Sequence, residues 1–250
     1  MKLGLGMYPS LLTADNYRFA RQAGATHVVA HLPGFAQREG RDLPSDQMWT
    51  LEELAELKSS MNAEGLEFAA IENFEVEHWY DVLLDGPKRD EQMSGLKELL
   101  RTMGTLGIGV MGYNFSYANV WGRVSTTRAR GGATSPGYSH ALAPDQAEIP
   151  NGMVWNTIYD PDAPEGSIGT VTEAMIWDRF ERFLRELVPV AEEAGAWPCT
   201  QPIRPWRRST EPSGSSQNRS TTSACSTWSP ATATPLSSAR ARSPRWMATW

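Results

Sequence analysis

One joint, a short turn ending in glycine and followed by an apolar run, occurs four times in the first 200 residues. The copies are residues 23–29 (AGATHVV), 64–70 (EGLEFAA), 106–112 (LGIGVMG) and 194–197 (AGAW). Glycine after a periodic apolar stretch is typical of a helix end, and the apolar run after it indicates a buried strand. The repeated joint therefore predicts helices that alternate with the strands of a parallel sheet and cover it.

The lengths of the predicted elements follow from the same pattern. Strands are expected at residues 2–7, 26–32, 66–72 and 108–115, and helices at residues 14–24, 50–65, 90–107 and 172–195. Helix 50–65 has the clearest signal, because Thr50 and Glu53 form a capping box and leucines repeat along one side. Residues 116–171 are too many for a plain connection, so we expect a lid or a subunit contact there.

Polar side chains follow three of the four predicted strands. In a parallel sheet covered by helices, the loops at the carboxyl ends of the strands converge on one opening, where ligands bind. His31 either caps its strand end or contacts a substrate, and both alternatives stay open. Glu72 ends an apolar strand, where an unpaired carboxylate is unfavourable, so a functional or ion-paired role is favoured. The amide of Asn114 suits a hydroxyl or a carboxylate.

Five stretches, taken together in their order and spacing, resemble the mannonate dehydratases. They are residues 22–34 (QAGATHVVAHLPG), 49–73 (WTLEELAELKSSMNAEGLEFAAIEN), 106–115 (LGIGVMGYNF), 120–124 (VWGRV) and 149–155 (IPNGMVW). The resemblance implies an α/β fold, a metal-dependent (β/α)8 TIM barrel related in architecture to the xylose isomerases. Residues 1–195 are then its N-terminal half, with about the first four βα units. Residues 196–250 are expected to form an irregular, disordered tail.

The resemblance also implies a hydro-lyase that converts D-mannonate to 2-keto-3-deoxygluconate and water in hexuronate (glucuronate) catabolism. It implies Mn2+ or Fe2+, a small sugar-acid substrate, and a homo-oligomer for the intact form. Trp121 is expected to wall the pocket and Arg123 to clamp the substrate carboxylate, with core packing and a surface ion pair as the alternatives. An insertion at residues 35–48, and Val120 where an aspartate is expected, leave the sugar acid open.

Two later signatures of the family are missing from the chain as written. One is His-Pro-x-Asp-Pro-Pro at a strand end and the other is Phe-Cys-x-Gly, and each supplies a metal ligand. Codons that encode residues 196–205 can also encode Leu-Ala-Leu-His-Pro-Ala-Asp-Pro-Pro when they are read in a frame shifted by one base. In the same shifted frame, codons for residues 234–246 can encode a segment that contains Phe-Cys-Gln-Gly. We therefore expect a frameshift after about residue 195. Without its metal ligands and catalytic residues, the chain is expected to be inactive and to bind the metal only weakly.

The charge of the chain changes at the same place. The chain has 23 Lys and Arg residues and 29 Asp and Glu residues. Residues 199–250 contain 7 of the basic and 1 of the acidic residues, which leaves 16 basic and 28 acidic residues in residues 1–198. An acidic body argues against nucleic acid as a partner. Residues 199–250 are rich in Ser, Thr and Arg and contain four Trp, a mixture typical of GC-rich DNA read out of frame. The alternative is a basic Ser/Arg tail that binds RNA or acidic partners.

The sequence shows no secretory signal and no apolar run long enough for a membrane span, so we expect a cytoplasmic protein with no membrane partner. Two other functions stay open. One is a sugar isomerase or epimerase of the xylose isomerase type, and the other is a non-catalytic fragment. An isomerase would use Glu, Asp and His ligands without the cysteine of the Phe-Cys-x-Gly signature.

Overall fold

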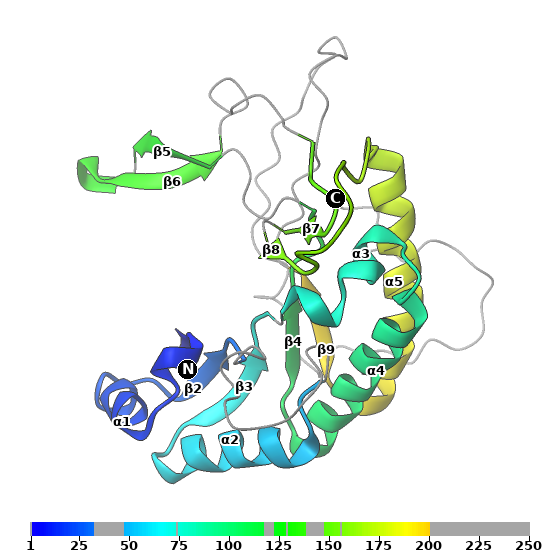
Figure 1. Ribbon diagram of the computed structural model, residues 1–250. Coiled ribbons are helices and arrows are strands. Elements are labelled where there is room, and N and C mark those ends of the chain that lie inside the picture. Colours follow the sequence, from blue (N-terminus) through cyan, green and yellow to red (C-terminus); the bar gives the residue numbers. More distant parts are fainter. Residues whose placement is uncertain are drawn as a thin grey trace, which may run out of the picture. The chain divides into compact units, whose positions relative to one another are not determined.

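The computed structural model describes residues 2–32, 48–73, 75–117, 123–128, 130–138, 148–155 and 157–200. Five parallel strands form the main sheet, in the order β1 (Gly4–Met7), β2 (His27–Ala30), β3 (Glu67–Ile71), β4 (Val110–Tyr113) and β9 (Trp197–Thr200). The long helices are α1 (Ala14–Gln22), α2 (Leu51–Ala63), α4 (Arg89–Leu106) and α5 (Glu173–Ala194). The spatial order of the strands is their order in the chain, as in a (β/α)8 barrel and unlike a doubly wound sheet. The fold is therefore part of a TIM barrel, with its helices along one side of the sheet (Figure 1).

The remaining elements are short. One 3-10 helix, η1 (Pro9–Leu11), follows β1, while η3 (Val76–His78) and α3 (Tyr80–Leu84) lie between β3 and α4. The long segment between β4 and α5 contains two antiparallel pairs. They are β5 (Arg123–Arg128) with β6 (Thr134–Tyr138), joined through η4 (Arg130–Gly132), and β7 (Met153–Val154) with β8 (Thr157–Ile158). The expected role of this segment as a lid or a subunit contact stays a prediction.

Helix ends follow the capping signals of the sequence. The side-chain oxygens of Thr13, Thr50 and Thr172 accept hydrogen bonds from backbone N–H groups in the first turns of α1, α2 and α5. The capping box at α2 is complete, because Thr50 N donates to Glu53 Oε2 over 2.8 Å and Glu53 N donates to Thr50 Oγ1 over 3.2 Å. Gly195 ends α5 in the left-handed conformation, with a φ of 69°. These contacts confirm the predicted helix boundaries.

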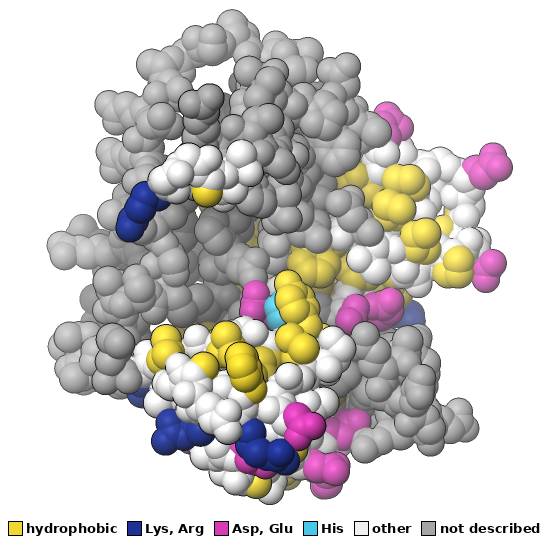
Figure 2. Space-filling view, turned by 90° about the vertical axis from the view of Figure 1, so that its left-hand side faces the viewer, with side chains coloured by type: hydrophobic (Ala, Val, Ile, Leu, Met, Phe, Trp, Pro, Cys, Tyr) yellow, Lys and Arg dark blue, Asp and Glu magenta, His cyan; other side chains and the backbone are white. Residues whose placement is uncertain are grey.

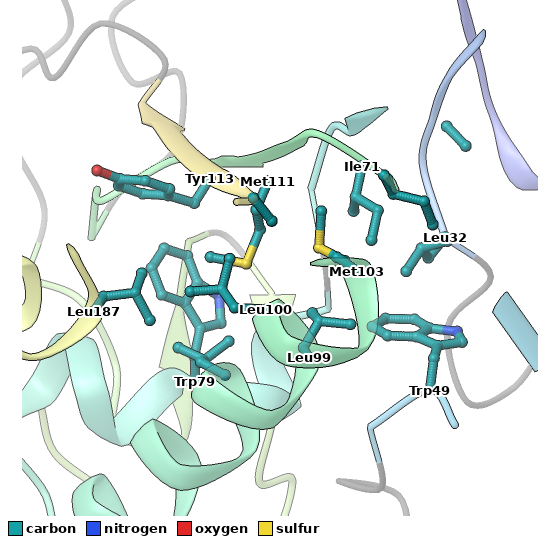
Figure 3. Packing of buried hydrophobic residues seen from close by; sticks show 14 of the residues in the cluster. Leu32, Trp49, Ile71, Trp79, Leu99, Leu100, Met103, Met111, Tyr113 and Leu187 are labelled. Atoms are coloured by element: carbon teal, nitrogen blue, oxygen red, sulfur yellow. The ribbon is translucent and has the colours of Figure 1, made fainter. Parts of the chain in front are cut away.

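The core lies between the sheet and its helices. Figure 3 shows Ile71, Met111 and Tyr113 of the strands near Leu99, Leu100 and Met103 of α4 and Leu187 of α5. Each of these side chains exposes at most 2% of its surface. Removing this apolar surface from water is the main force that holds the helices on the sheet. Side chains on the opposite face of the strands lie outside this core.

The ordered part of the chain extends past the boundary expected at residue 195. Trp197–Thr200 form β9, and Trp197 N donates to Gly109 O over 2.9 Å where β9 begins to pair with β4. Alternate residues of a parallel strand bond to opposite sides, so the nitrogen of Pro198, which carries no hydrogen, faces away from β4. Proline is tolerated there because no strand of the described residues lies on that side. The rest of the expected tail, residues 201–250, lies outside the described residues.

A charged contact between α3 and α5 makes stability depend on pH. Arg182 Nη2 lies 2.9 Å from Asp85 Oδ2, and the hydrogen bond from Arg182 lowers the pKa of the Asp85 carboxyl below its ordinary value. Asp85 also ends α3 in the left-handed conformation, with a φ of 62°. Asparagine adopts this conformation as well, so Asp85→Asn removes the charge and keeps the backbone.

We expect Asp85→Asn to lower the free energy of unfolding near pH 7 by less than about 1 kcal/mol, because solvent screens this exposed pair. A carboxyl whose pKa is lowered by folding stabilises the fold above the pKa of the unfolded chain, about 4. That contribution is lost as the pH falls through the folded pKa. The difference between the two chains should therefore shrink as urea unfolding is repeated from about pH 5 downward. A difference that grows toward acid pH would contradict this explanation.

Candidate functional site

The strand registers bring the ends of β1 to β4 into one row. Across these strands, Met7, Ala30, Ile71 and Met111 pair in sequence, and all four are buried. The residues that follow them are Tyr8, His31, Glu72 and Gly112. Side chains alternate between the two faces of a strand, and the paired residues face the helices. The row Tyr8, His31, Glu72 and Gly112, here called the rim row, therefore faces the opposite side.

His31 and Glu72 form the centre of the rim row. His31 Nε2 lies 3.1 Å from Glu72 Oε2, and the Tyr8 ring stacks on the His31 ring with centroids 4.5 Å apart. Backbone hydrogen bonds of 2.9 Å hold the pair, from His31 N to Met7 O and from Glu72 N to Ala30 O. Solvent still reaches both side chains, which are 20% and 32% exposed. Figure 2 shows a histidine next to an acidic side chain on this side of the molecule.

Two glycines leave room around Glu72. A Cβ atom on Gly6 would lie 3.5 Å from Glu72 Oε2, an ordinary contact distance. A Cβ atom on Gly112 would lie 2.4 Å from Glu72 O and 2.9 Å from Ile71 O, closer than side chains approach a backbone oxygen. The end of β3 therefore passes directly over Gly112. Position 112 therefore has to lack a side chain if Glu72 is to reach His31.

We expect Gly112→Ala to displace the end of β3, with a loss of about 1–3 kcal/mol in the free energy of unfolding. The contact between His31 and Glu72 should break, and the His31 ring should then react faster with diethyl pyrocarbonate. Gly6→Ala is the matched control, since neither glycine has a left-handed φ and the comparison tests space alone. Mass spectrometry of each histidine peptide gives the rates. Equal His31 rates in the two variants would refute the role given to Gly112.

The loop after β4 carries Asn114, which is only 8% exposed. Tyr117 holds this loop in place. The Tyr117 hydroxyl donates to Leu83 O, and Arg179 Nη1 donates to the Tyr117 hydroxyl oxygen over 2.8 Å. Trp155 N also donates to Tyr117 O, over 2.5 Å. Burial raises the pKa of Tyr117, and the nearby Arg179 opposes that rise. Contacts with α3, α5 and the β7 region thus fix the loop, so Asn114 has a defined place at the end of β4.

The loop after β3 adds a carboxyl group with a raised pKa. Burial raises the pKa of Glu75, and the neighbouring Glu77 raises it further. The buried amide of Gln92 holds the following segment, since its Oε1 accepts from Asp81 N over 2.8 Å and its Nε2 donates to Glu77 O over 3.2 Å. This carboxyl therefore keeps its proton to higher pH than an ordinary glutamate does. This chemistry was not predicted from the sequence.

The match to known proteins runs from α1 to β9 and begins after β1 and Tyr8. Residues 13–207 match the family model of D-mannonate dehydratase (UxuA). The chain belongs to this family. A mannonate dehydratase of Streptococcus pneumoniae (strain 70585) is 30% identical over 175 residues, which make up 66% of this chain and 46% of that protein. A mannonate dehydratase of Thermotoga neapolitana is 30% identical over 161 residues, 63% of this chain and 42% of that protein.

A solved structure has the same fold as this member of the mannonate dehydratase family. The crystal structure of mannonate dehydratase from Streptococcus suis serotype 2 matches with a TM-score of 0.54 and 24% identity, over 80% of this chain and 53% of that chain. The chain spans about half the length of the curated mannonate dehydratases it matches. Within the described residues, no helix is long and apolar enough to cross a membrane.

The structure brings together some of the residues expected to bind substrate and leaves others outside its description. His31, Glu72 and Asn114 lie at the ends of three adjacent strands, β2, β3 and β4. Trp121 lies outside the described residues, and Arg123 begins β5 with a side chain that is likewise not described. Tyr8, which stacks on His31, was not among the residues expected to bind substrate.

The described residues do not fit the Mn2+ or Fe2+ site that membership of the mannonate dehydratase family implies. No group of three or more His, Cys, Asp or Glu in the described ranges is arranged to hold a metal ion. His31 and Glu72 are two donors of suitable type, but they contact each other. A transition-metal site needs three or more converging ligands. The phenol of Tyr8, the imidazole of His31 and the carboxylate of Glu72 are groups that can form hydrogen bonds.

Proposed function

We propose that this chain is the substrate-holding N-terminal half of a mannonate dehydratase, a cytoplasmic hydro-lyase that forms 2-keto-3-deoxygluconate and water from D-mannonate. The observation that supports it is the rim row, in which Tyr8, His31 and Glu72 lie side by side in a chain of this family. Asn114 at the next strand end, and Trp121 and Arg123 beyond it, complete the proposed binding set. The intact enzyme would be a homo-oligomer.

Dehydration requires two changes in the substrate: a proton leaves C2, and the C3 hydroxyl leaves as water. The C2–H bond breaks next to the carboxylate, the C3–O bond breaks, and the hydroxyl takes up a proton. The enol that results moves a proton from its C2 hydroxyl to C3 and becomes the 2-keto acid. Mn2+ or Fe2+, when bound by the rest of the enzyme, supplies stabilisation of the negative charge that develops on the substrate.

The residues of this chain would contribute orientation. Hydroxyl groups can donate to Glu72, and both the oxygen and the NH2 group of Asn114 can bond to them. Because His31 and the backbone hold Glu72, little order has to be gained when a ligand binds. Fixing the polyhydroxylated chain in this way would align the C2 proton and the C3 hydroxyl with groups that remove and protonate them.

We infer that the chain as written does not complete the reaction. The metal ligands and the acid and base residues of the family would follow residue 195, in the frame that permits the two missing signatures. A chain with its frame restored after Gly195, and continued to the length of its relatives, tests the activity against a panel of sugar acids. We expect 2-keto acid from D-mannonate. Conversion of ketoses without any sugar-acid dehydration would favour the isomerase alternative instead.

A further inference from the structure

Tyr117 contacts three segments that are far apart in the chain. Its hydroxyl donates to Leu83 O at the end of α3, and Arg179 Nη1 of α5 donates to the hydroxyl oxygen over 2.8 Å and to Leu83 O over 3.2 Å. Trp155, which follows β7, donates its backbone N–H to Tyr117 O over 2.5 Å. Leu83 O is one of the last carbonyls of α3, which a helix cannot bond internally, so these donors complete the end of α3. These four residues are here called the Tyr117 junction.

Arg179 is the charged member of the Tyr117 junction. Its guanidinium carbon lies 5.9 Å from the centroid of the Tyr117 ring, while Nη1 donates to both oxygens of the junction. Hydrogen bonds from a charged donor are roughly twice as strong as those between neutral groups, and the planar guanidinium loses little order in making them. Tyr117 is only 4% exposed, so water competes weakly for these bonds. Arg179 therefore ties α5 to two other segments through one buried hydroxyl.

The backbone of Trp155 has a conformation that needs support from its neighbours. Its φ is 58°, in the left-handed region that bulky side chains rarely adopt. Such strain persists only where surrounding contacts hold it, and it is concentrated at ligand sites and at segments that switch. The hydrogen bond from Trp155 N to Tyr117 O is a contact of this kind. Breaking the Tyr117 junction should therefore allow the backbone at Trp155 to relax.

The same helix holds the chain on both sides of the position next to Asn114. Ser116 N donates to Asn114 O over 2.9 Å, which makes a tight turn between Asn114 and the Tyr117 junction. Phe115, inside this turn, is fully buried, and its ring centroid lies 5.1 Å from that of Phe180 in α5. Arg179 directly precedes Phe180. The place of Asn114 at the end of β4 thus depends on two adjacent residues of α5, which lies beside α3 in Figure 1.

We propose that Arg179 is a positioning residue for Asn114. Through the Tyr117 hydroxyl it joins the loop after β4 to the end of α3 and to Trp155, so that these three segments open and close as one unit. Arg179 would act on a ligand through this unit and not by touching it. The value of Asn114 as a substrate contact rests on the proposed function, whereas the joint opening is a property of the chain itself.

The test compares single and double variants of the 250-residue chain. Tyr117→Phe keeps the ring and removes the hydroxyl, Arg179→Met removes the guanidinium, and the double variant combines them. Arg185→Met is the matched control, because Arg185 lies in the same helix, is 74% exposed and pairs with Glu181 one turn away. Hydrogen exchange, read by mass spectrometry of peptides, measures how often each segment opens. A second readout is the side-chain amide signal of Asn114 in protein labelled with nitrogen-15 at asparagine, identified by its loss in Asn114→Ser.

Our proposal expects exchange in residues 80–86, 113–117 and 153–158 to become about tenfold faster or more in each single variant, and by similar factors in all three segments. The double variant should be within about twofold of the faster single variant, because both changes break the same junction. The Asn114 amide signal should shift in both single variants. Exchange in α1 and α2 should stay unchanged throughout, and Arg185→Met should change neither readout.

Three results would overturn the inference. Faster exchange in α1 and α2 as well would mean that the junction supports the whole fold and not one opening unit. Effects that multiply in the double variant would mean that Tyr117 and Arg179 act independently. An Asn114 signal that stays in place in both single variants would mean that Arg179 does not position this side chain. Each outcome leaves the proposed function to its own assay, in which the frame-restored chain either forms 2-keto acid from D-mannonate or does not.

Discussion

Replacing Phe183 with alanine should lower the free energy of unfolding by about 3–5 kcal/mol, a large share of the stability of a domain of this size. Phe183 lies in α5, is fully buried, and is surrounded by aromatic rings. Its ring centroid lies 5.1 Å from that of Tyr113, 5.4 Å from that of Phe115 and 6.2 Å from that of Trp79. The alanine variant would leave a cavity that these large rings cannot fill without moving.

The cavity should be felt at the candidate site as well. Tyr113 is the last residue of β4 and Phe115 lies beside Asn114 in the loop that follows, so their packing on Phe183 supports the position of Asn114 directly. Urea unfolding monitored by Trp fluorescence measures the loss of stability. Trp177→Ala is the matched control, because Trp177 lies in the same helix but is 43% exposed. A change within about 0.5 kcal/mol is expected there; a similar loss in both variants would refute the central position given to Phe183.

Much of the fold could be predicted from the sequence because its signals are local. Capping threonines, glycines at helix ends and apolar runs act over a few residues, and each expected strand and helix of residues 1–195 is present close to its predicted position. The placement of polar residues at strand ends then follows from parallel pairing alone. This is why the sequence alone predicts that His31, Glu72 and Asn114 lie at the same end of the sheet.

The contact between His31 and Glu72 could not be predicted, because it depends on strand register. β2 and β3 change register between Val28 and Val29, and only after this irregularity does Ala30 pair with Ile71. A shift of one residue moves a side chain to the other face of the sheet. No local pattern in the sequence signals this irregularity, so the pairing of the two rim residues had to come from the structure.

Close backbone approaches were also beyond sequence reasoning. Gly112 lies against the backbone of β3, and Gly104 of α4 lies where an added Cβ atom would be 2.2 Å from Ala194 O of α5. In the sequence, a glycine that is needed because a neighbouring backbone leaves no room for a side chain looks the same as a glycine that ends a helix. The difference lies in the elements that pack around it. The strand Trp197–Thr200 continues into residues that were expected to be irregular, because its pairing with β4 outweighs the poor strand propensity of proline.

The second large effect concerns turnover. If the metal ligands and acid–base residues follow residue 195 in another frame, restoring that frame should change the chain from inactive to an enzyme with a turnover number of roughly 1–1000 per second. The N-terminal half, proposed to hold the substrate, offers no converging metal ligands among its described residues. Without stabilisation of the charge that develops at the carboxylate, the C2 proton stays on the substrate.

One measurement tests this account most directly: the rate of 2-keto acid formation from D-mannonate by the 250-residue chain and by the frame-restored chain, side by side, with Mn2+ supplied to both. We predict formation by the restored chain, a strong reduction when it also carries Glu72→Gln, and no formation above background by the 250-residue chain. Turnover of D-mannonate by the 250-residue chain itself would contradict the account, because its residues would then complete the reaction that we assign to two halves of a barrel.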